Sequence, residues 1–406
     1  MQMPFLLQEG CLGVETLTEE DTMIRTSVFS RAAIMAGAAF FVFSIGTSDV
    51  ALAAEKKGAK IITSSSDKVK VRITGQISRA ANYIDDGSPG SSRMRYMDSN
   101  YSSSRFLILT SSKITSDIKV NGRVEVAVDD NRNFQGVAAF GGRTGNDFQT
   151  RKMELYFTHK QFGRVWIGAG TTAGDGIMNN GISGVYAALP AGDGLDVGGI
   201  NFRNADGSNS GATILGTFTD FDFFGRQTRV MYDTPVIAGF MASVSHSDEQ
   251  IWEASLNYSG TILDTKVKAR IGYGDASLSD NRDFAGGSIS AVHSSGLGAT
   301  FNLGATNEDV RDQTNGAEDR FGWQIQGHFG RKFTELGKST IVGSFWYIEN
   351  VAQSGDIGKA TAVTFQQNVD AAALQLWAKY INFDLNRPGS DFDDINTFSV
   401  GARVKF

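Results

Sequence analysis

The chain has 406 residues, a formal net charge of −6, 41% hydrophobic residues and a slightly negative mean hydropathy. This composition excludes a helical membrane protein, which needs several apolar stretches of about 20 residues, and it gives no electrostatic basis for binding nucleic acid. The single cysteine, Cys11, excludes an intrachain disulfide and a cysteine metal site. High glycine content with many phenylalanines and only five prolines favours an all-β chain.

The N-terminal segment, residues 1–53, is expected to be a signal peptide with an extension before it. Two arginines precede an apolar core at 32–45, and 51–53 form a small-x-small cleavage pattern. A membrane anchor is the alternative, but the core is short for a hydrocarbon layer of about 30 Å. The first residues are acidic, so Met23 is the expected start of translation. Removing six acids and two arginines changes the net charge from −6 to about −2 and eliminates Cys11.

After a polar stretch at 54–68, expected to be a short periplasmic lead, residues 69–406 alternate between apolar and polar side chains. A period of two residues indicates strands whose two faces meet different surroundings. The clearest run is 116–130, where Val and Ile alternate with Lys, Arg and Glu. The sixteen expected strands are 69–84, 103–114, 116–130, 149–159, 162–169, 226–234, 236–247, 250–260, 263–274, 284–294, 297–306, 319–332, 338–349, 358–369, 371–385 and 394–406.

The hairpin at 225–248 shows the two faces most plainly. Val230 and Tyr232 share one face, Arg229 belongs to the other, and the second strand repeats the alternation. Pro235 fixes φ and donates no hydrogen bond, so we expect it in the tight turn between the strands. A soluble sandwich could use such a hairpin, and so could a membrane barrel with a polar lumen.

The connections between the expected strands favour the barrel. Short turns alternate with long loops along the chain, and the longest connection is 170–225. Short periplasmic turns and long extracellular loops are typical of transmembrane barrels, and an even strand count puts both termini on the periplasmic side. The predicted fold is therefore all-β: a 16-stranded antiparallel transmembrane β-barrel.

Several short motifs resemble the general porins of the bacterial outer membrane over residues 69–406. They are Gly75-Gln76-Ile77, Ser104-Arg105-Phe106, Gly122-Arg123-Val124-Glu125, the run from Arg229 to Pro235 followed by Ala238-Gly239-Phe240, and the terminal Phe406. The resemblance implies a water-filled channel for passive diffusion of ions and small hydrophilic solutes. It further implies a homotrimer in contact with lipid and lipopolysaccharide, assembly through machinery that reads Phe406, and a third loop folded into the pore.

The resemblance also implies a constriction between acids on that third loop and bases on the barrel wall. Loop three, 170–225 by position, contains several acids against a lone Arg203: Asp175, Asp193, Asp196, Asp206, Asp220 and Asp222. We take Asp175, Asp193 and Asp196 as its constriction acids. The wall bases expected from strand parity are Arg105, Lys119, Arg123, Lys152 and Arg229, and Lys268 and Arg270 also point inward. Opposed charges would set up a transverse field that disfavours apolar solutes.

Two points stay open from the residues alone. Glu125 and Glu154 share the wall with the bases, so the sign of ion selectivity is undecided. An outer-membrane adhesin or structural barrel, a barrel enzyme and a soluble secreted β-protein are the competing functions. An enzyme needs a serine–histidine or acid pair held together, and the four histidines lie on different strands without ligand spacing. We therefore expect no catalytic residue, metal or cofactor.

Overall fold

The computed structural model describes the chain from residue 61 to residue 406, with gaps in several loops. The described residues are 61–63, 68–87, 93–130, 146–189, 192, 194–219, 221, 223–276, 282–308, 319–350 and 353–406. The predicted targeting segment, Met23 and the loop acids Asp193, Asp220 and Asp222 lie outside them. Within the described residues, no helix is both long enough and apolar enough to cross a membrane.

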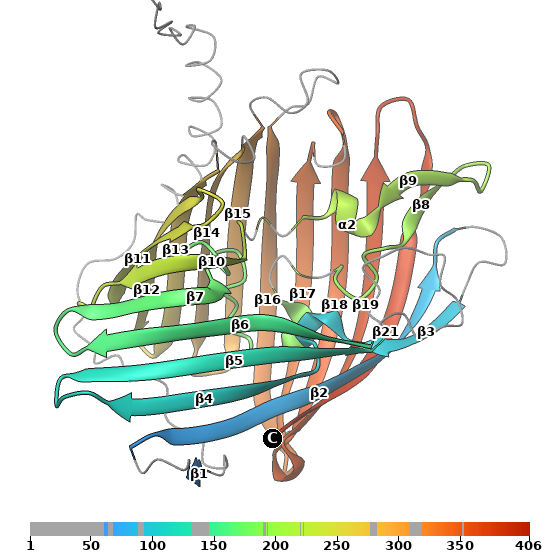
Figure 1. Ribbon diagram of the computed structural model, residues 1–406. Helices are drawn as coiled ribbons and strands as arrows, with labels where there is room; N and C mark the ends of the chain where they lie inside the picture. Colours follow the sequence, from blue (N-terminus) through green and yellow to red (C-terminus); the bar gives the residue numbers. More distant parts are fainter. Residues whose placement is uncertain are drawn as a thin grey trace, which may run out of the picture.

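Sixteen antiparallel strands in the described part of the chain close into a barrel, as predicted (Figure 1). Each strand pairs with the next along the chain, and the last pairs with the first. The barrel strands are β2 (Lys70–Asp85), β4 (Arg105–Lys113), β5 (Ile118–Asp130), β6 (Asn146–His159), β7 (Gly163–Thr171), β10 (Arg226–Asp233), β11 (Phe240–Ser247), β12 (Trp252–Ile262), β13 (Thr265–Asp275), β14 (Arg282–His293), β15 (Leu297–Glu308), β16 (Arg320–Thr334), β17 (Gly337–Glu349), β18 (Ile357–Val369), β19 (Leu374–Asn386) and β21 (Ile395–Lys405).

Strand β2 closes the barrel because its two edges pair with strands from opposite ends of the chain. Its first half pairs with β4, and its second half pairs with β21, from Gln76 opposite Lys405 to Asp85 opposite Asn396. Two short strands extend these ladders. β1 (Ile61–Thr63) pairs with the start of β2, and β3 (Arg93–Asp98) pairs with its end. The expected loop at 85–102 therefore contains a strand, and part of the expected lead is also paired.

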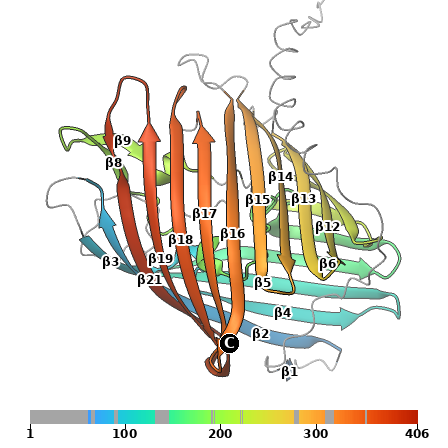
Figure 2. The same cartoon turned by 180° about the vertical axis from the view of Figure 1, so that it is seen from behind.

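The two faces of the strands follow the predicted parity. In β21, Phe398, Val400 and Val404 are exposed on the outside, whereas Ser399 and Arg403 are buried toward the lumen. The outer face is apolar because it meets hydrocarbon, and closed ladders leave no unpaired backbone group in lipid. Figure 2, the view from behind Figure 1, shows β12 to β19 side by side along one wall of the barrel.

The turn of the β10–β11 hairpin differs from the prediction. The tight turn lies at Ile237–Phe240, where Phe240 N–H donates to the Ile237 carbonyl at 2.9 Å. Ala238 and Gly239 have φ of 50° and 87°, the two consecutive positive values of a turn that matches strand twist. Pro235, with φ restricted to negative values, cannot occupy either position and precedes the turn. The second strand consequently begins at Phe240 instead of 236.

Loop three lies inside the barrel and has secondary structure of its own. β8 (Asn201–Asn204) and β9 (Asn209–Thr213) form a small sheet with β20 (Phe392–Asp393), and α2 (Ile214–Thr217) follows. Figure 1 shows this part of the loop beside β17 to β19. Phe218 packs on Trp346 and Phe383, with ring centroids 5.4 and 5.2 Å apart. An apolar cluster therefore fixes the loop to one side of the inner wall.

Gly75, on the lipid face of β2, lies against the chain terminus. A Cβ atom at Gly75 would lie 2.6 Å from the Arg105 carbonyl oxygen and 2.7 Å from Cζ of Phe406. We expect Gly75→Val to destabilise the barrel by about 1–3 kcal/mol through overpacking. The urea midpoint of the refolded chain, followed by heat-modifiable gel mobility, measures this effect. Gly343→Val on β17 is the control, because no atom lies within 4 Å of its added Cβ. Equal midpoints for the two variants would contradict the prediction.

Candidate functional site

Charged side chains on β4, β5 and β6 form a paired network on the inner wall. Arg105 donates from Nη1 to the Glu125 carboxylate at 2.9 Å, and its Nε donates to the Ser103 carbonyl at 3.0 Å. Arg151 donates from Nε to the same Glu125 oxygen at 2.8 Å. Charge-assisted bonds of this kind keep both guanidinium groups in defined positions. Arg105 keeps 20% of its side chain exposed and Arg151 keeps 17%, so both groups also reach lumen water.

Arg151 was not expected in this network. Its parity in β6 matches Met153 and points to lipid. The register between β5 and β6 shifts at Glu125 and Val126, which face Lys152 and Thr150, and Arg151 is the extra residue. A bulge re-aims the side chain of the inserted residue. Strand parity alone could not find this base, because a bulge changes the count on one strand only.

Glu154 on β6 joins two more of the predicted bases. It accepts from Nε of Arg123 at 2.6 Å and from Nη2 of Arg229 at 2.6 Å. Arg229 also donates to the carbonyls of Thr171 and Gly168, at 2.8 and 2.9 Å. Its side chain has no exposed surface, whereas Arg123 keeps 23% of its own exposed. Arg229 therefore fixes the origin of loop three, and Arg123 is the member of this trio that faces water.

The remaining two predicted wall bases differ in position. Lys152 is half-buried opposite Glu125 and interacts electrostatically with Asp175 on loop three. Lys119 is exposed at the turn end of β5, opposite Lys113 and away from this network in the ladder. The structure thus brings Lys152 together with the central charges and leaves Lys119 near the turn end.

The two described acids of the predicted constriction also separate. Asp175 is partly exposed at the start of loop three. Asp196 is fully buried, and its Oδ1 accepts from the Asn100 backbone N–H at 2.5 Å. Burial raises the pKa of Asp196 to about 7, against hydrogen bonds from Ser99 and Asn100 that favour the charged form. Asp196 is therefore a contact between loop three and the turn after β3, and a passing solute would not meet it.

Two cations on the inner faces of β19 and β21 also contact loop three. Lys379 donates to the Ala187 carbonyl at 3.0 Å and lies 4.4 Å from the centre of the Tyr101 ring. Arg403 lies over the Tyr186 ring at 3.7 Å. Sequence parity could identify both side chains as inward, but their partners come from a loop whose path no local pattern specifies.

The path of loop three explains which wall stays charged. Its first half makes hydrogen bonds with the inner faces of β12, β14 and β16. The Gly174 N–H donates to Glu253 at 2.9 Å. Ser290 donates to the Asn180 carbonyl at 2.8 Å, and Gln326 donates to the Ala188 carbonyl at 3.4 Å. The arginines on β4, β5 and β6 pair mainly with carboxylates on their own wall. A loop acid facing bases on the opposite wall sets up a field across the lumen. No group of three or more His, Cys, Asp or Glu in the described residues is placed to hold a metal ion.

Comparisons with known proteins agree with this architecture. A family profile described as Gram-negative porin matches residues 33–403. A loop-deletion mutant of OmpT, an outer membrane protein of Vibrio cholerae, superposes with a TM-score of 0.57 at 15% identity, covering 84% of this chain and 100% of that one. An anion-selective porin from Comamonas acidovorans gives 0.57 at 13% identity, with 84% and 100% covered. OmpF of Salmonella typhi, in complex with daunomycin, gives 0.53 at 11% identity, with 84% and 98% covered. Comparison with curated protein sequences found no match.

The buried Asp196 makes its loop contact pH-dependent. Its pKa of about 7 in the folded loop lies above the ordinary aspartate value of 3.8. The stabilising contribution is therefore full below pH 4 and is lost as pH rises through 7. We expect hydrogen–deuterium exchange of the Asn100 amide, corrected for its intrinsic rate, to lose protection by up to roughly tenfold per pH unit between these values.

An Asp196→Asn variant should show no such trend, because its side chain does not titrate. Asp206→Asn is the matched control: Asp206 is an exposed acid of the same loop, and its loss should leave the wild-type trend in place. Flat protection in the wild type would contradict the assignment.

Proposed function

The chain belongs to the Gram-negative porin family and forms a diffusion channel in the bacterial outer membrane, and from this premise we propose that its narrowest part lies between the β4–β6 wall and the start of loop three. On the wall side the water-facing groups are Arg105, Arg123 and Lys152. Asp175 faces them from the loop. The observation that carries the proposal is the cluster of partly exposed cations on one wall, next to the one described acid of the predicted set that keeps contact with water.

We infer a mild preference for anions in this constriction. Glu125 is shared by Arg105 and Arg151, and Glu154 is shared by Arg123 and Arg229. With Lys152 and Asp175 included, the whole cluster contains five cations and three carboxylates, and of these Arg229 is fully buried. The excess positive charge raises the local concentration of anions. Both glutamates are buried behind their arginines, so they present less charge to the lumen than their number suggests.

Polar solutes of small size fit this arrangement best. A field across a narrow water-filled passage orients dipoles, and a passing apolar molecule must displace oriented water. The family and the fold favour a channel over a barrel enzyme or an adhesin. No step of the proposed function needs a nucleophile, a metal or a cofactor.

We further propose that the working unit is a homotrimer. OmpT of Vibrio cholerae, one of the structural neighbours, has been solved in a trimer form. The outer faces of β2 and β21 expose Ile73, Ile77 and Phe398, which suits contact with lipid or with a neighbouring copy. The apolar outer belt fits outer-membrane lipid and lipopolysaccharide, and Phe406 is the proposed signal for the assembly machinery.

Ion selectivity tests the constriction. In planar bilayers under a potassium chloride gradient, we expect a chloride-to-potassium permeability ratio above one. Lys152→Gln should lower this ratio by roughly twofold and Asp175→Asn should raise it by a similar factor, since a charge at several ångströms in water acts with somewhat less than 1 kcal/mol. Lys119→Gln is the control of equal charge change. An unchanged ratio in both constriction variants, or an equal change in the control, would remove these residues from the constriction.

Conductance steps test the assembly. After the refolded mature chain inserts into a planar bilayer, we expect the current through one inserted unit to fall to zero in three equal steps. Chemical cross-linking of the same sample should give a trimer that dissociates on boiling. Single-step closure with only monomers after cross-linking would contradict the trimer and leave the channel assignment intact.

A further inference from the structure

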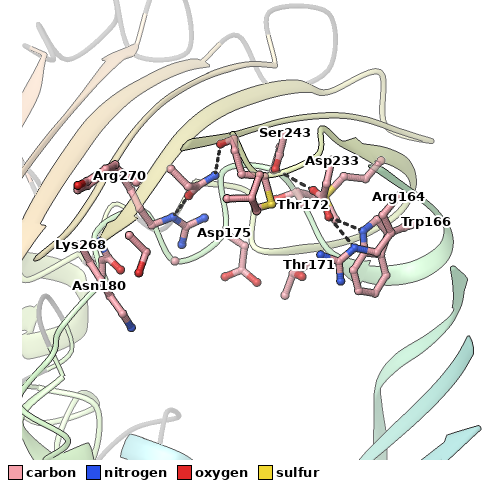
Figure 3. A pocket seen from close by; sticks show the side chains of 18 of the residues that line it. Arg164, Trp166, Thr171, Thr172, Asp175, Asn180, Asp233, Ser243, Lys268 and Arg270 are labelled. Carbon is pink, nitrogen blue, oxygen red and sulfur yellow. Dashed lines mark hydrogen bonds and ion pairs between the residues drawn. The ribbon is translucent and has the colours of Figure 1, made fainter. Parts of the chain in front are cut away.

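A hollow of about 560 Å³ lies inside the barrel beside the proposed constriction (Figure 3). Its wall comes from β7, β10, β11, β12 and β13, and its inner side comes from the first residues of loop three. This volume lies within the range of pockets that bind small organic molecules. Figure 3 shows Lys268 and Arg270 at one end, Arg164 and Trp166 at the other, and Asp175 between them.

The first end of the hollow is cationic. Lys268 and Arg270 are two residues apart on the lumen face of β13, so their Cα atoms lie roughly 7 Å apart. Arg270 donates from Nε to Asn257 at 2.5 Å, which fixes the direction of its guanidinium group. In the part of the chain that the structure describes, the Lys268 ammonium has no hydrogen-bond or ion-pair partner. Two cations at this spacing can hold one carboxylate between them.

The other end combines apolar side chains with a carboxylate whose charge is already compensated. Trp166 and Met231 pack together with Ala173 of loop three, and Met241 lines the hollow beside them. Asp233 accepts from Trp166 Nε1 and from Ser243 Oγ, both at 2.8 Å, and pairs with Arg164 at 3.2 Å. Two hydrogen bonds and one ion pair therefore compensate this carboxylate, and it does not repel an anion that enters the hollow.

Asp175 limits the charge that the hollow accepts. The charges of Arg164 and Asp233 cancel each other. The remaining charged residues that line the hollow are two cations, Lys268 and Arg270, and one acid, Asp175. The excess is one positive charge. A monoanion compensates it, whereas a second negative charge on the solute would lie near the Asp175 carboxylate.

We propose that this hollow is a weak binding site for small organic monoanions with an apolar or aromatic body, such as aryl carboxylates. The carboxylate lies between Lys268 and Arg270, and the body lies over Met231 and Met241. The inference rests on the proposed channel function, because solutes reach the hollow from the lumen. Weak binding suits a channel, since a solute that binds tightly beside the constriction would not leave it.

Block of the chloride current by benzoate is the first test. In planar bilayers we expect benzoate to reduce the single-channel current with saturation in the millimolar range. Acetate lacks the apolar body and benzyl alcohol lacks the charge, so both should block at least tenfold more weakly. Equal block by acetate and benzoate would show that charge alone acts and would overturn the site.

Two substitutions separate the ends of the site. Lys268→Gln should raise the half-blocking benzoate concentration tenfold or more, because a charge-assisted bond is lost. Met241→Ala should raise it several-fold for benzoate and leave acetate unchanged. Lys266→Gln is the matched control: it removes the same charge from the same strand, and Lys266 does not line the hollow. An effect of Lys266→Gln as large as that of Lys268→Gln would overturn the proposal.

A binding measurement without current keeps this inference distinct from the channel function. Saturation-transfer NMR on the folded, detergent-solubilised chain should show magnetisation transfer to the ring protons of benzoate, and Lys268→Gln should reduce it. Transfer that depends on Lys268 in a barrel that does not conduct would support the site and contradict the channel. Normal conductance with neither magnetisation transfer to benzoate nor block by benzoate would contradict the binding site and leave the channel function standing.

Discussion

Backbone pairing between β2 and β21 is the constraint on which the rest of this structure depends. Hydrocarbon offers no partner for an N–H or C=O group, so a sheet in the membrane must close on itself. The ladder from Gln76–Lys405 to Asp85–Asn396 supplies that closure. The terminal residue takes part in it, because Phe406 exchanges backbone hydrogen bonds with Gly75 at 2.8 and 3.0 Å. Once the ladder is closed, every strand has one face toward lipid and one toward the interior.

The closed wall creates an interior that the chain fills unevenly. Loop three covers the inner faces of β17 to β19 with an apolar cluster that includes Phe202, Phe218 and Phe383. Arg229 on β10 donates to the Thr171 carbonyl at the origin of the loop and to Glu154 on β6. Lys379 on β19 donates to the Ala187 carbonyl of the loop. Apolar contacts therefore cover one side of the interior, while the charged network occupies β4 to β6. The proposed selectivity depends on this asymmetry.

Charges in the network stay at the wall because each glutamate is shared by two arginines. An unpaired carboxylate buried behind a strand would be costly, and so would an unpaired guanidinium. Sharing compensates both groups and still leaves a net positive surface toward water. The same logic appears at Asp233, whose two hydrogen bonds and one ion pair compensate its charge at the end of the hollow opposite the cations of β13. Most charges of the inner wall are therefore compensated by a neighbour, and the partly exposed cations are the ones that meet the water of the lumen.

The sequence by itself determined the strand count and most of the residues that face lipid, because both follow from a period of two that is local to the chain. The alternation of short turns with long loops then favoured a membrane barrel over a soluble sandwich. It also identified Arg123 and Lys152 as inward bases by that parity. Tertiary structure alone decided the rest. A bulge brought Arg151 into the network, and two positive φ values moved the turn beyond Pro235. Loop burial turned Arg229 and Asp196 into anchors. The bulge and the loop anchors depend on contacts between residues far apart in the chain, and no local pattern records where a long loop will lie.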